Sequence, residues 1–301
     1  MSKVIVFGSL NMDLSIESDH MPALGETIIG RGFITNPGGK GANQAVAAAK
    51  LGASVIMLGA VGEDAFGDQM IAALAEHGVQ CERIARAANA PTGVALITRV
   101  FGDNFITIDS GANFSTGIAD IRAALDETAQ GGDVFLCQLE CDFDVTMEAL
   151  KDAHERGLYT VINPAPARKL PDWVLPHLDL VVVNEGECEM LTGIYPHDEA
   201  SARAAMEQLV DAGVGTVAVT LGERGSMILS HGRLIVSEPP TVQAIDTTCA
   251  GDTYIGALVA GYSRALTIDA AVDIATRASA FATTKVGAQQ SIPVLADVTG
   301  D

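Results

Sequence analysis

The stretch best suited to chemistry runs from Ala244 to Leu258 and places two carboxylates among small and hydroxylated residues. Its second half has apolar residues at helical spacing, so we predict a loop that leads into a helix. The N–H groups of Ala250, Gly251 and Asp252 would then lack helical acceptors and form an anion site. A carboxylate there suits a base that deprotonates a hydroxyl attacking a phosphoryl group. Asp252 is also explained as an ordinary first-turn residue, and this stretch alone leaves both explanations open.

A second glycine-rich stretch, Pro37 to Gln44, leads into an alanine-rich helix that we predict to end at Gly52. It is not a Walker A loop, because the upstream glycine is missing and Gly41 follows the lysine. Paired glycines let a backbone approach a ligand closely, and Lys40 and Asn43 add a charge and an amide at the same place. We therefore favour a ligand cradle over a simple turn.

Polar residues recur just beyond predicted strands. Val4 to Phe7 is a strand-length apolar run followed by a polar loop that contains Asn11 and Asp13. The carboxyl ends of parallel strands meet at one edge of a sheet, and ligands bind at that edge. The residues that we expect at the same edge after later strands are Gln138, Glu140, Asn163, Asn184, Glu187, Thr220 and Gly222.

Several of these residues have a local explanation as well. Glu140 either accepts hydrogen bonds from sugar hydroxyls or caps the next helix, and Asn184 begins a helix, where capping is common. An amide and a carboxylate at Asn184 and Glu187 also suit the water shell of a magnesium ion. The stretch from Thr220 to Gly225 is by itself only a turn, although its glycines would let a nucleotide lie close.

The elements that must position these residues follow from the apolar pattern. Strand-length runs alternate with helical stretches over most of the chain, which predicts a mostly parallel sheet with helices on its faces. Two patches, Glu26 to Asn36 and Gly93 to Ile108, do not continue this alternation. We predict that they form a small separate sheet that serves as a lid or a dimer surface. Edge strands of the main sheet are the alternative.

Composition excludes several classes of function. The 301 residues, 48% of them hydrophobic, are enough for one large core with a small appendage, and a net charge of -20 argues against nucleic-acid binding. Five cysteines without framework spacing indicate free thiols in a reducing compartment. No signal peptide or membrane-spanning run is evident, so we predict a cytoplasmic protein. Zinc-ligand spacing, a nucleophile elbow and a dinucleotide fingerprint are all missing.

The two glycine-containing stretches together resemble a known family. Gly38 to Asn43 and Asp246 to Thr253 are similar to the paired signatures of the ribokinase-like sugar kinases, the PfkB family, and the similarity extends over the whole chain. It implies one α/β domain over residues 1–301, a three-layer sandwich with a mostly parallel central sheet and a small β-sheet lid. The lid strands would be inserted at about 14–37 and 93–109. The implied activity is ATP-dependent phosphorylation of the 5-hydroxyl of D-ribose, with Mg²⁺, an activating K⁺ and a homodimer formed through the lid.

The resemblance also implies roles for individual residues. Asp252 would be the general base, with Ala250 and Gly251 in the anion hole. The implied sugar-binding residues are Asn11, Asp13, Gly39, Lys40, Asn43, Glu140 and Asp246. The implied nucleotide contacts are Asn184, Thr220, Gly222 and Gly225, and the residues tied to Mg²⁺ through water are Asn184 and Glu187. The implied potassium site, built largely from backbone carbonyls, consists of Asp246, Thr248, Ala282, Lys285, Gly287 and Ser291.

Two alternatives remain open at this stage. The acceptor could be 2-deoxyribose, a nucleoside or a phosphorylated hexose, although Asp13 and Asn43 would suit a vicinal diol and favour ribose. A sugar sensor that kept the fold and lost the chemistry is disfavoured by the intact Asp252 and Lys40. Cys249 departs from the small residues that relatives often carry there. A thiol at a helix N-terminus is expected to have a lowered pKa, which predicts sensitivity to oxidation.

Overall fold

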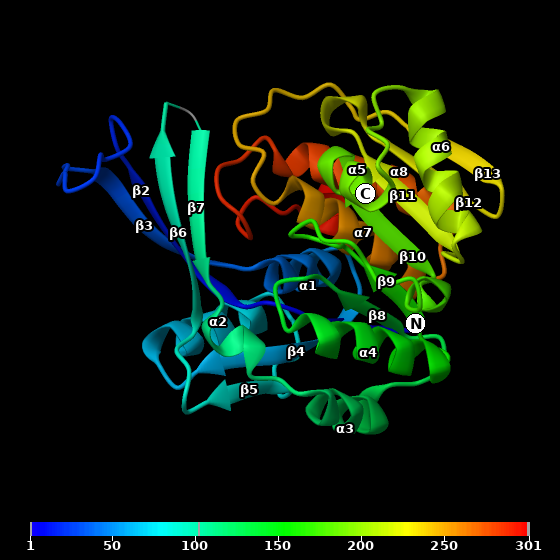
Figure 1. The fold of residues 1–301 in the computed structure, drawn as a ribbon, viewed down its shortest axis with the longest axis horizontal. Coiled ribbons are helices and arrows are strands. Elements are labelled where there is room, and N and C mark those ends of the chain that lie inside the picture. Colours follow the sequence, from blue (N-terminus) through cyan, green and yellow to red (C-terminus); the bar gives the residue numbers. More distant parts are fainter. Residues whose placement is uncertain (1, 102, 300–301) are drawn as a thin grey trace.

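The computed structural model describes residues 2–101 and 103–299. In this part of the chain, nine strands form the main sheet in the order β13-β12-β11-β10-β9-β8-β1-β4-β5 (Figure 1). All neighbouring strands are parallel except β11, β12 and β13, which pair antiparallel, so the predicted mostly parallel sheet is confirmed. The strand bounds are β1 Lys3–Phe7, β4 Ser54–Gly62, β5 Ile84–Ala87, β8 Val134–Cys137, β9 Tyr159–Ile162, β10 Leu180–Asn184, β11 Thr216–Thr220, β12 Ser226–Ser230 and β13 Arg233–Ser237.

Helices cover both faces of this sheet and make a three-layer sandwich (Figure 1). One core contains residues of α1 (Lys40–Lys50), α2 (Ala65–Glu76), α7 (Ala250–Ser263), α8 (Ile268–Ala282) and α9 (Leu295–Thr299). The other contains residues of α3 (Ile118–Thr128), α4 (Phe143–Glu155), α5 (Glu185–Thr192) and α6 (Glu199–Asp211). None of the helices in the described ranges is long and apolar enough to cross a membrane.

Strand β1 shows why a continuous apolar run lies at the centre of the sheet. Successive side chains of a strand point to opposite faces. Val4 and Val6 therefore belong to the core under α1 and α7, whereas Ile5 and Phe7 belong to the core under α3 and α4. All four side chains are at most 1% exposed, as expected for a parallel strand that is covered on both sides.

A separate four-stranded sheet projects from one end of the molecule in the described part of the chain (Figure 1). Its order is β3-β2-β6-β7, and its strands are β2 Asn11–Glu17, β3 Arg31–Gly38, β6 Gly93–Val100 and β7 Asp103–Asp109. The pair β2 and β6 is parallel, and the two outer pairs are antiparallel. The predicted separate small sheet is thus present, and it does not extend the main sheet.

Two details of the prediction were wrong. Asn11 and Asp13 lie in strand β2 rather than in a polar loop after β1, because Asn11 already pairs with Gly38 and Gly93. The patch Glu26 to Asn36 contains a single strand, which begins only at residue 31. Residues 23–26 form a local turn, in which the Glu26 carboxylate accepts the N–H of Ala23, and residues 26–30 belong to no strand.

Candidate active site

Asp252 lies in the first turn of α7 and is held by two amides of helix α1. Asn43 Nδ2 donates to Asp252 Oδ2 at 3.1 Å, and Gln44 Nε2 donates to Asp252 Oδ1 at 2.9 Å. The two helices approach closely because Gly256 of α7 faces Ala47 and Ala48 of α1, where a Cβ at Gly256 would lie 2.4 Å from the Ala47 methyl. The packing of these helices therefore brings the two predicted motifs into contact.

The N-terminus of α7 has two of the three free N–H donors that the sequence predicted. Ala250 donates its N–H to Thr247 O at 3.2 Å, so this group is already used in a turn. The N–H groups of Gly251 and Asp252 have no hydrogen-bond partner among residues 2–101 and 103–299. Ala250 is therefore a weaker candidate for the anion hole than its two successors. Two unbonded N–H groups at a helix N-terminus still favour an anion.

Glu140 does not cap α4, because Asp142 is the capping residue of that helix. Its Oε2 atom instead accepts a hydrogen bond from the Ser9 hydroxyl and, at 3.2 Å, from the N–H of Lys40. Ser9 Oγ in turn accepts the N–H of Gly41 at 3.3 Å. The first turn of α1 is thus tied to the ends of strands β1 and β8, which lie side by side in the main sheet.

Asp13 faces the same group of charges from the small sheet. Burial, and then the negative charges of Glu140 and Asp252, raise the pKa of its carboxyl to about 7. Its neighbour in β2, Asn11, is fixed by Asn113, whose Nδ2 atom donates to Asn11 Oδ1 at 2.7 Å. The carboxylates therefore repel one another, and hydrogen-bond donors from a ligand would relieve that repulsion.

Lys40 is the cation that this acidic group surrounds. Burial acts to lower its pKa, but the charges of Asp252, Glu140 and Glu187 raise the pKa above its ordinary value. The ammonium therefore stays charged at neutral pH. Gly39, immediately before it, has φ 89°, and a Cβ there would lie 2.8 Å from the backbone N of Asn11. Only glycine fits this turn without strain, which explains the second residue of the glycine pair.

Asp246 joins two loops beside the N-terminus of α7. Its Oδ1 atom accepts the N–H of Thr248 at 2.9 Å, and its Oδ2 atom accepts the N–H of Gly287 at 3.0 Å. Burial acts to raise its pKa, but these hydrogen bonds hold the pKa below the usual value. The carboxylate is therefore ionised at neutral pH and keeps further lone pairs for a ligand.

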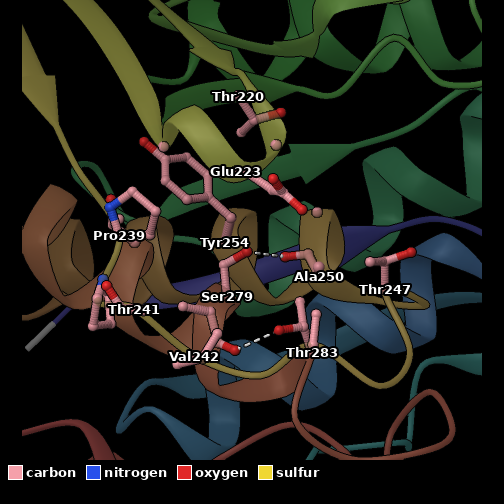
Figure 2. Close-up of a pocket in the computed structure, with 17 residues that line it drawn as sticks. Thr220, Glu223, Pro239, Thr241, Val242, Thr247, Ala250, Tyr254, Ser279 and Thr283 are labelled. Atoms are coloured by element: carbon pink, nitrogen blue, oxygen red, sulfur yellow. Dashed lines mark hydrogen bonds between the residues drawn. The ribbon is translucent and has the colours of Figure 1, made fainter.

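A cavity of about 500 Å³ extends from the α7 N-terminus to the loop after β13. Thr220, Gly222 and Gly225, three of the predicted nucleotide contacts, line it, whereas Asn184 does not. Figure 2 shows Thr247 and Ala250 at one end of the cavity and Pro239 and Thr241 at the other. Helix N–H groups thus lie at one end of the cavity, and a proline-containing loop lies at the other end.

Helix α8 forms a wall of this cavity that the sequence did not reveal. Thr276, Ser279 and Ala280 line it, as does Thr283 directly after the helix, and Ser279 Oγ donates to Ala250 O at 2.9 Å (Figure 2). Because α8 bonds to the first turn of α7, it helps to hold the helix N-terminus at the end of the cavity. No local motif marks these α8 residues, so their contribution followed only from the tertiary structure.

Asn184 and Glu187 form a capping box at the start of α5. Asn184 Oδ1 accepts the N–H of Glu187 at 2.8 Å, while the Glu187 carboxylate accepts the N–H of Asn184 at 2.9 Å. Glu187 also accepts a hydrogen bond at 3.1 Å from Asn163 Nδ2. The capping explanation of Asn184 is therefore correct, and it coexists with a Glu187 carboxylate directed toward the site.

Comparisons with known proteins decide the family. The family model described as "pfkB family carbohydrate kinase" matches residues 1–295. The chain is 38% identical over 289 residues to the ribokinase of Haemophilus influenzae, covering 96% of this chain and 94% of that protein. The chain belongs to the PfkB family. It is also 35% identical to a deoxyribokinase of Salmonella typhi, with 96% of this chain and 95% of that protein covered.

A solved PfkB-type structure has the same fold. The structure of Arabidopsis thaliana ribokinase complexed with ribose and ATP superposes with a TM-score of 0.91 at 28% identity. The match covers 99% of this chain and 98% of that chain. The predicted ribokinase-like fold, with its central sheet and additional small sheet, is therefore confirmed.

The predicted magnesium residues fit an ion that is held through water. Glu187 is 9% exposed, and burial raises its pKa against the lowering effects of the Asn184 hydrogen bond and the Lys40 charge. No group of three or more His, Cys, Asp or Glu residues in the described ranges could hold a metal directly. Mg²⁺ keeps several waters and needs few carboxylates, so this donor set is compatible with it.

The predicted potassium residues lie on two segments that the fold joins. Ile245 and Asp246 both donate their N–H groups to Thr283 O, at 2.8 and 3.1 Å. Lys50 Nζ donates to the carbonyls of Gln289 and Ile292, at 2.9 and 2.8 Å. Carbonyls of the second segment thus already face an ammonium ion. These two carbonyls belong to none of the predicted potassium residues, so the contact does not test the predicted site, and K⁺ remains a prediction.

The expected lowering of the Cys249 pKa was wrong. Although Cys249 precedes the α7 N-terminus, it is 9% exposed, and burial and the Asp252 charge raise the pKa of its thiol well above the ordinary value. A helix dipole does not compensate for removal from water combined with a neighbouring carboxylate. The residue packs into the core under α7 instead.

We predict that Cys249 in the folded protein resists alkylation at neutral pH. Cys137, Cys141 and Cys188 are buried as well, and Cys81 is partly exposed, so Cys81 should be the first of the five to react. Mass spectrometry after brief iodoacetamide treatment, with the urea-unfolded protein as the control, measures this order. Rapid modification of Cys249 accompanied by loss of activity would contradict the assigned burial.

Proposed function

We propose that the protein is an ATP-dependent kinase that transfers the terminal phosphoryl group of ATP to the 5-hydroxyl of D-ribose. The observation that carries this proposal is the position of Asp252. Asp252 lies in the first turn of α7, where Gly251 lines the 500 Å³ cavity and the N–H groups of Gly251 and Asp252 are unbonded within the described ranges, and its charge acts on Asp13 together with that of Glu140. The similarity to ribokinases, one of them complexed with ribose and ATP, supports the assignment.

In the proposed reaction, Asp252 removes the proton of the sugar hydroxyl as its oxygen attacks the terminal phosphorus. Negative charge that develops on the transferred group is stabilised by the N–H groups of Gly251 and Asp252 and by the Lys40 ammonium. Bound Mg²⁺ would neutralise phosphate charge, with Glu187 and Asn184 orienting its water shell. Catalysis then rests on positioning and electrostatics.

The proposed sugar side of the site is formed by Asn11, Asp13, Gly39, Lys40, Asn43, Glu140 and Asp246. The proposed nucleotide side is the cavity lined by Thr220, Gly222 and Gly225. The similarity to a deoxyribokinase makes 2-deoxyribose the second candidate acceptor. A cytoplasmic location stays a prediction from the cysteine content.

The test of the function is ADP release from Mg-ATP in the presence of D-ribose, 2-deoxy-D-ribose, fructose 6-phosphate or adenosine. We expect ribose-dependent turnover that is faster in potassium than in sodium buffer. Turnover only with 2-deoxyribose would replace the acceptor, and no turnover with any of the four would overturn the proposed function. A rate that is equal in potassium and sodium would remove the proposed cation site.

Sugar binding should strengthen as pH rises, because Asp13 has a pKa of about 7 in the free protein. Sugar hydroxyls donate best to the ionised carboxyl, so binding should release a proton. If only the ionised form binds, the affinity for ribose rises by up to about tenfold per pH unit below the pKa and levels off above it. Calorimetric titration without nucleotide, in buffers of different ionisation enthalpy, measures both effects.

Asp13→Asn is the control for this pH dependence. The variant should bind ribose more weakly and with little change between about pH 6 and about pH 8. Its folding stability should also respond, since the carboxyl has a raised pKa in the folded state. The contribution of Asp13 to stability falls as pH rises from about 4 to about 7, so the variant should gain stability relative to the parent over that range. A ribose affinity of the parent that is independent of pH would contradict the prediction.

We further propose that the protein forms a homodimer through the small sheet. Large apolar side chains are exposed on both of its faces: Phe33 at 63% and Leu96 at 51% lie on one face, and Ile106 at 57% lies on the opposite face. A concentration of exposed apolar side chains on one small sheet is typical of an interface. Sedimentation velocity should give a dimer at micromolar concentration, and a monomer throughout would contradict the proposal.

A further inference from the structure

The first turns of α1 contain a fully buried glutamine whose polar atoms all have partners. Gln44 Nε2 donates to Asp252 Oδ1 at 2.9 Å and to Asn163 Oδ1 at 3.3 Å. Gln44 Oε1 accepts from Gln138 Nε2 at 2.6 Å. Gln44 is 0% exposed, Gln138 is 1% exposed and Asn163 is 5% exposed. These three side chains, which we call the carboxamide network, come from α1 and from the ends of β8 and β9.

The amide groups of the carboxamide network can adopt only one orientation, because the network ends on two carboxylates, those of Asp252 and Glu187. Asn163 Nδ2 donates to Glu187 Oε2 at 3.1 Å, and the Gln44 amide donates to Asp252. Carboxylates accept and do not donate when ionised, so the NH₂ group of each amide must face its acid. Rotating the Gln44 amide by half a turn would place its oxygen against Asp252 and its NH₂ group against that of Gln138. The Gln44 amide is thus fixed in direction.

Both oxygens of Asp252 are held by neighbouring residues of α1. Asn43 Nδ2 donates to Oδ2 at 3.1 Å, opposite the Gln44 contact with Oδ1. Asn43 is itself fixed by Gln289 Nε2, which donates to Asn43 Oδ1 at 3.3 Å. Two donors on the two oxygens fix the plane of the carboxylate and leave further lone pairs on each oxygen for a hydroxyl proton.

One atom of the carboxamide network lowers the stability of the folded protein, which a purely structural role of the network does not explain. Gln138 Oε1 is buried and has no hydrogen-bond partner within the described ranges. An unsatisfied buried acceptor costs about 1–3 kcal/mol, and an apolar residue could fill the same space. The residues that follow in α1 are small and apolar, Ala45, Val46, Ala47 and Ala48, and all are 0% exposed. A buried amide at this point therefore calls for a role that an apolar side chain cannot supply.

From these contacts we infer that Gln44 is a positioning residue, which fixes the Asp252 carboxylate for proton removal and links it through Asn163 to Glu187. The inference rests on the proposed function, in which Asp252 is the base. Gln44 is fully buried and does not line the 500 Å³ cavity, so it acts through the side chains that it contacts, on Asp252 directly and on Glu187 through Asn163. Its loss should slow the chemical step and leave substrate binding nearly unchanged.

Gln44→Met tests this role, since methionine has a similar length and no amide. We expect kcat to fall by roughly tenfold to a hundredfold, with KM for ribose and for ATP changed by less than about threefold. Thr160→Val is the matched control, because Thr160 is equally buried on β9 and bonds through its hydroxyl to His177 O at 2.6 Å, away from the site. Its stability should fall while kcat stays that of the wild type.

A double-mutant cycle separates positioning from general disruption. If Gln44 acts through Asp252, Gln44→Met should change the residual kcat of Asp252→Asn by less than about twofold. An equal loss in both backgrounds would overturn the inference, and so would a raised KM with unchanged kcat. Should Gln44→Met fail to fold, Gln138→Met decides in its place. It removes the donor to Gln44 Oε1, so the Gln44 amide is held from one side only, which should lower kcat at unchanged KM; an unchanged kcat would overturn the inference.

The wild-type measurement in the same assay distinguishes the two levels of proposal. Ribose-dependent turnover by the wild type combined with unchanged Gln44 and Gln138 variants would overturn the positioning role and leave the proposed function intact. No turnover by the wild type would overturn the proposed function and this inference with it.

Discussion

Replacing Asp252 by asparagine should lower kcat by roughly two to four orders of magnitude while ribose still binds, because the variant lacks the base that receives the hydroxyl proton. Asparagine keeps the size of the side chain and one oxygen for the Asn43 and Gln44 donors. Loss of one negative charge should also lower the pKa of Asp13, which the Asp252 charge helps to raise. Initial rates of ADP release and calorimetric titration with ribose measure the two effects.

The control for Asp252→Asn is Asp269→Asn. Asp269 also lies in the first turn of a helix, α8, where it forms an exposed ion pair with Arg233. Asp269 therefore has the role that the alternative explanation gives to Asp252, that of a first-turn residue stabilised by the helix dipole. This effect is about 0.3–1 kcal/mol. We expect wild-type turnover from Asp269→Asn. Near-normal turnover from Asp252→Asn would refute the assignment of the base.

The second large effect should come from Gly256→Val, one turn beyond the site. A Cβ at Gly256 would lie 2.4 Å from Ala47 Cβ and 2.8 Å from Ala48 N and Gln44 O. Two of these atoms belong to the backbone and cannot rotate away, so α1 and α7 must separate. We expect destabilisation at or above the range of about 1–3 kcal/mol that is typical of overpacking. The folded fraction should lose turnover as well, since Asn43 and Gln44 would move away from Asp252.

Gly186→Val is the stability control for this prediction. Gly186 is an exposed residue of α5, and the nearest atom to a Cβ there is Asn184 Oδ1 at 3.6 Å. Both substitutions place a β-branched residue in a helix, so the difference between them reports the clash alone. Urea unfolding of the three proteins measures it. Equal stability of the Gly256 and Gly186 variants would contradict the close packing of α1 and α7.

Much of the fold was predictable because it depends on short-range patterns. The buried run Val4 to Phe7 and its successors predicted parallel strands, and their spacing predicted the helices between them. The small sheet was recognised because Gly93 to Ile108 breaks that alternation. The position of Asn11 and Asp13 in β2 was missed, since pairing with Gly38 and Gly93 is a contact between distant segments.

Part of the candidate site was also predictable. Small residues before a helix predicted the donors at Gly251 and Asp252, and the similarity to PfkB kinases supplied the proposed sugar and nucleotide residues. Ser9 and Gln44 were not assigned, although both lie within or beside stretches that the sequence singled out. A serine or a glutamine has many local explanations, and only its partners distinguish among them.

The sequence by itself determined the alternation of strands and helices in the main domain, the helix start at residue 250 and the family, because each of these depends on neighbouring residues or on a linear motif. The tertiary structure decided which groups interact. Gln44 and Asp252 are 208 positions apart, and the packing of α1 on α7 brings them within hydrogen-bond distance. The tertiary structure also decided the direction of pKa shifts. The pKa of Cys249 is raised, whereas its position at a helix N-terminus alone predicted a lowered pKa. Burial and charge proximity are properties of distances between remote segments, and linear spacing does not encode them.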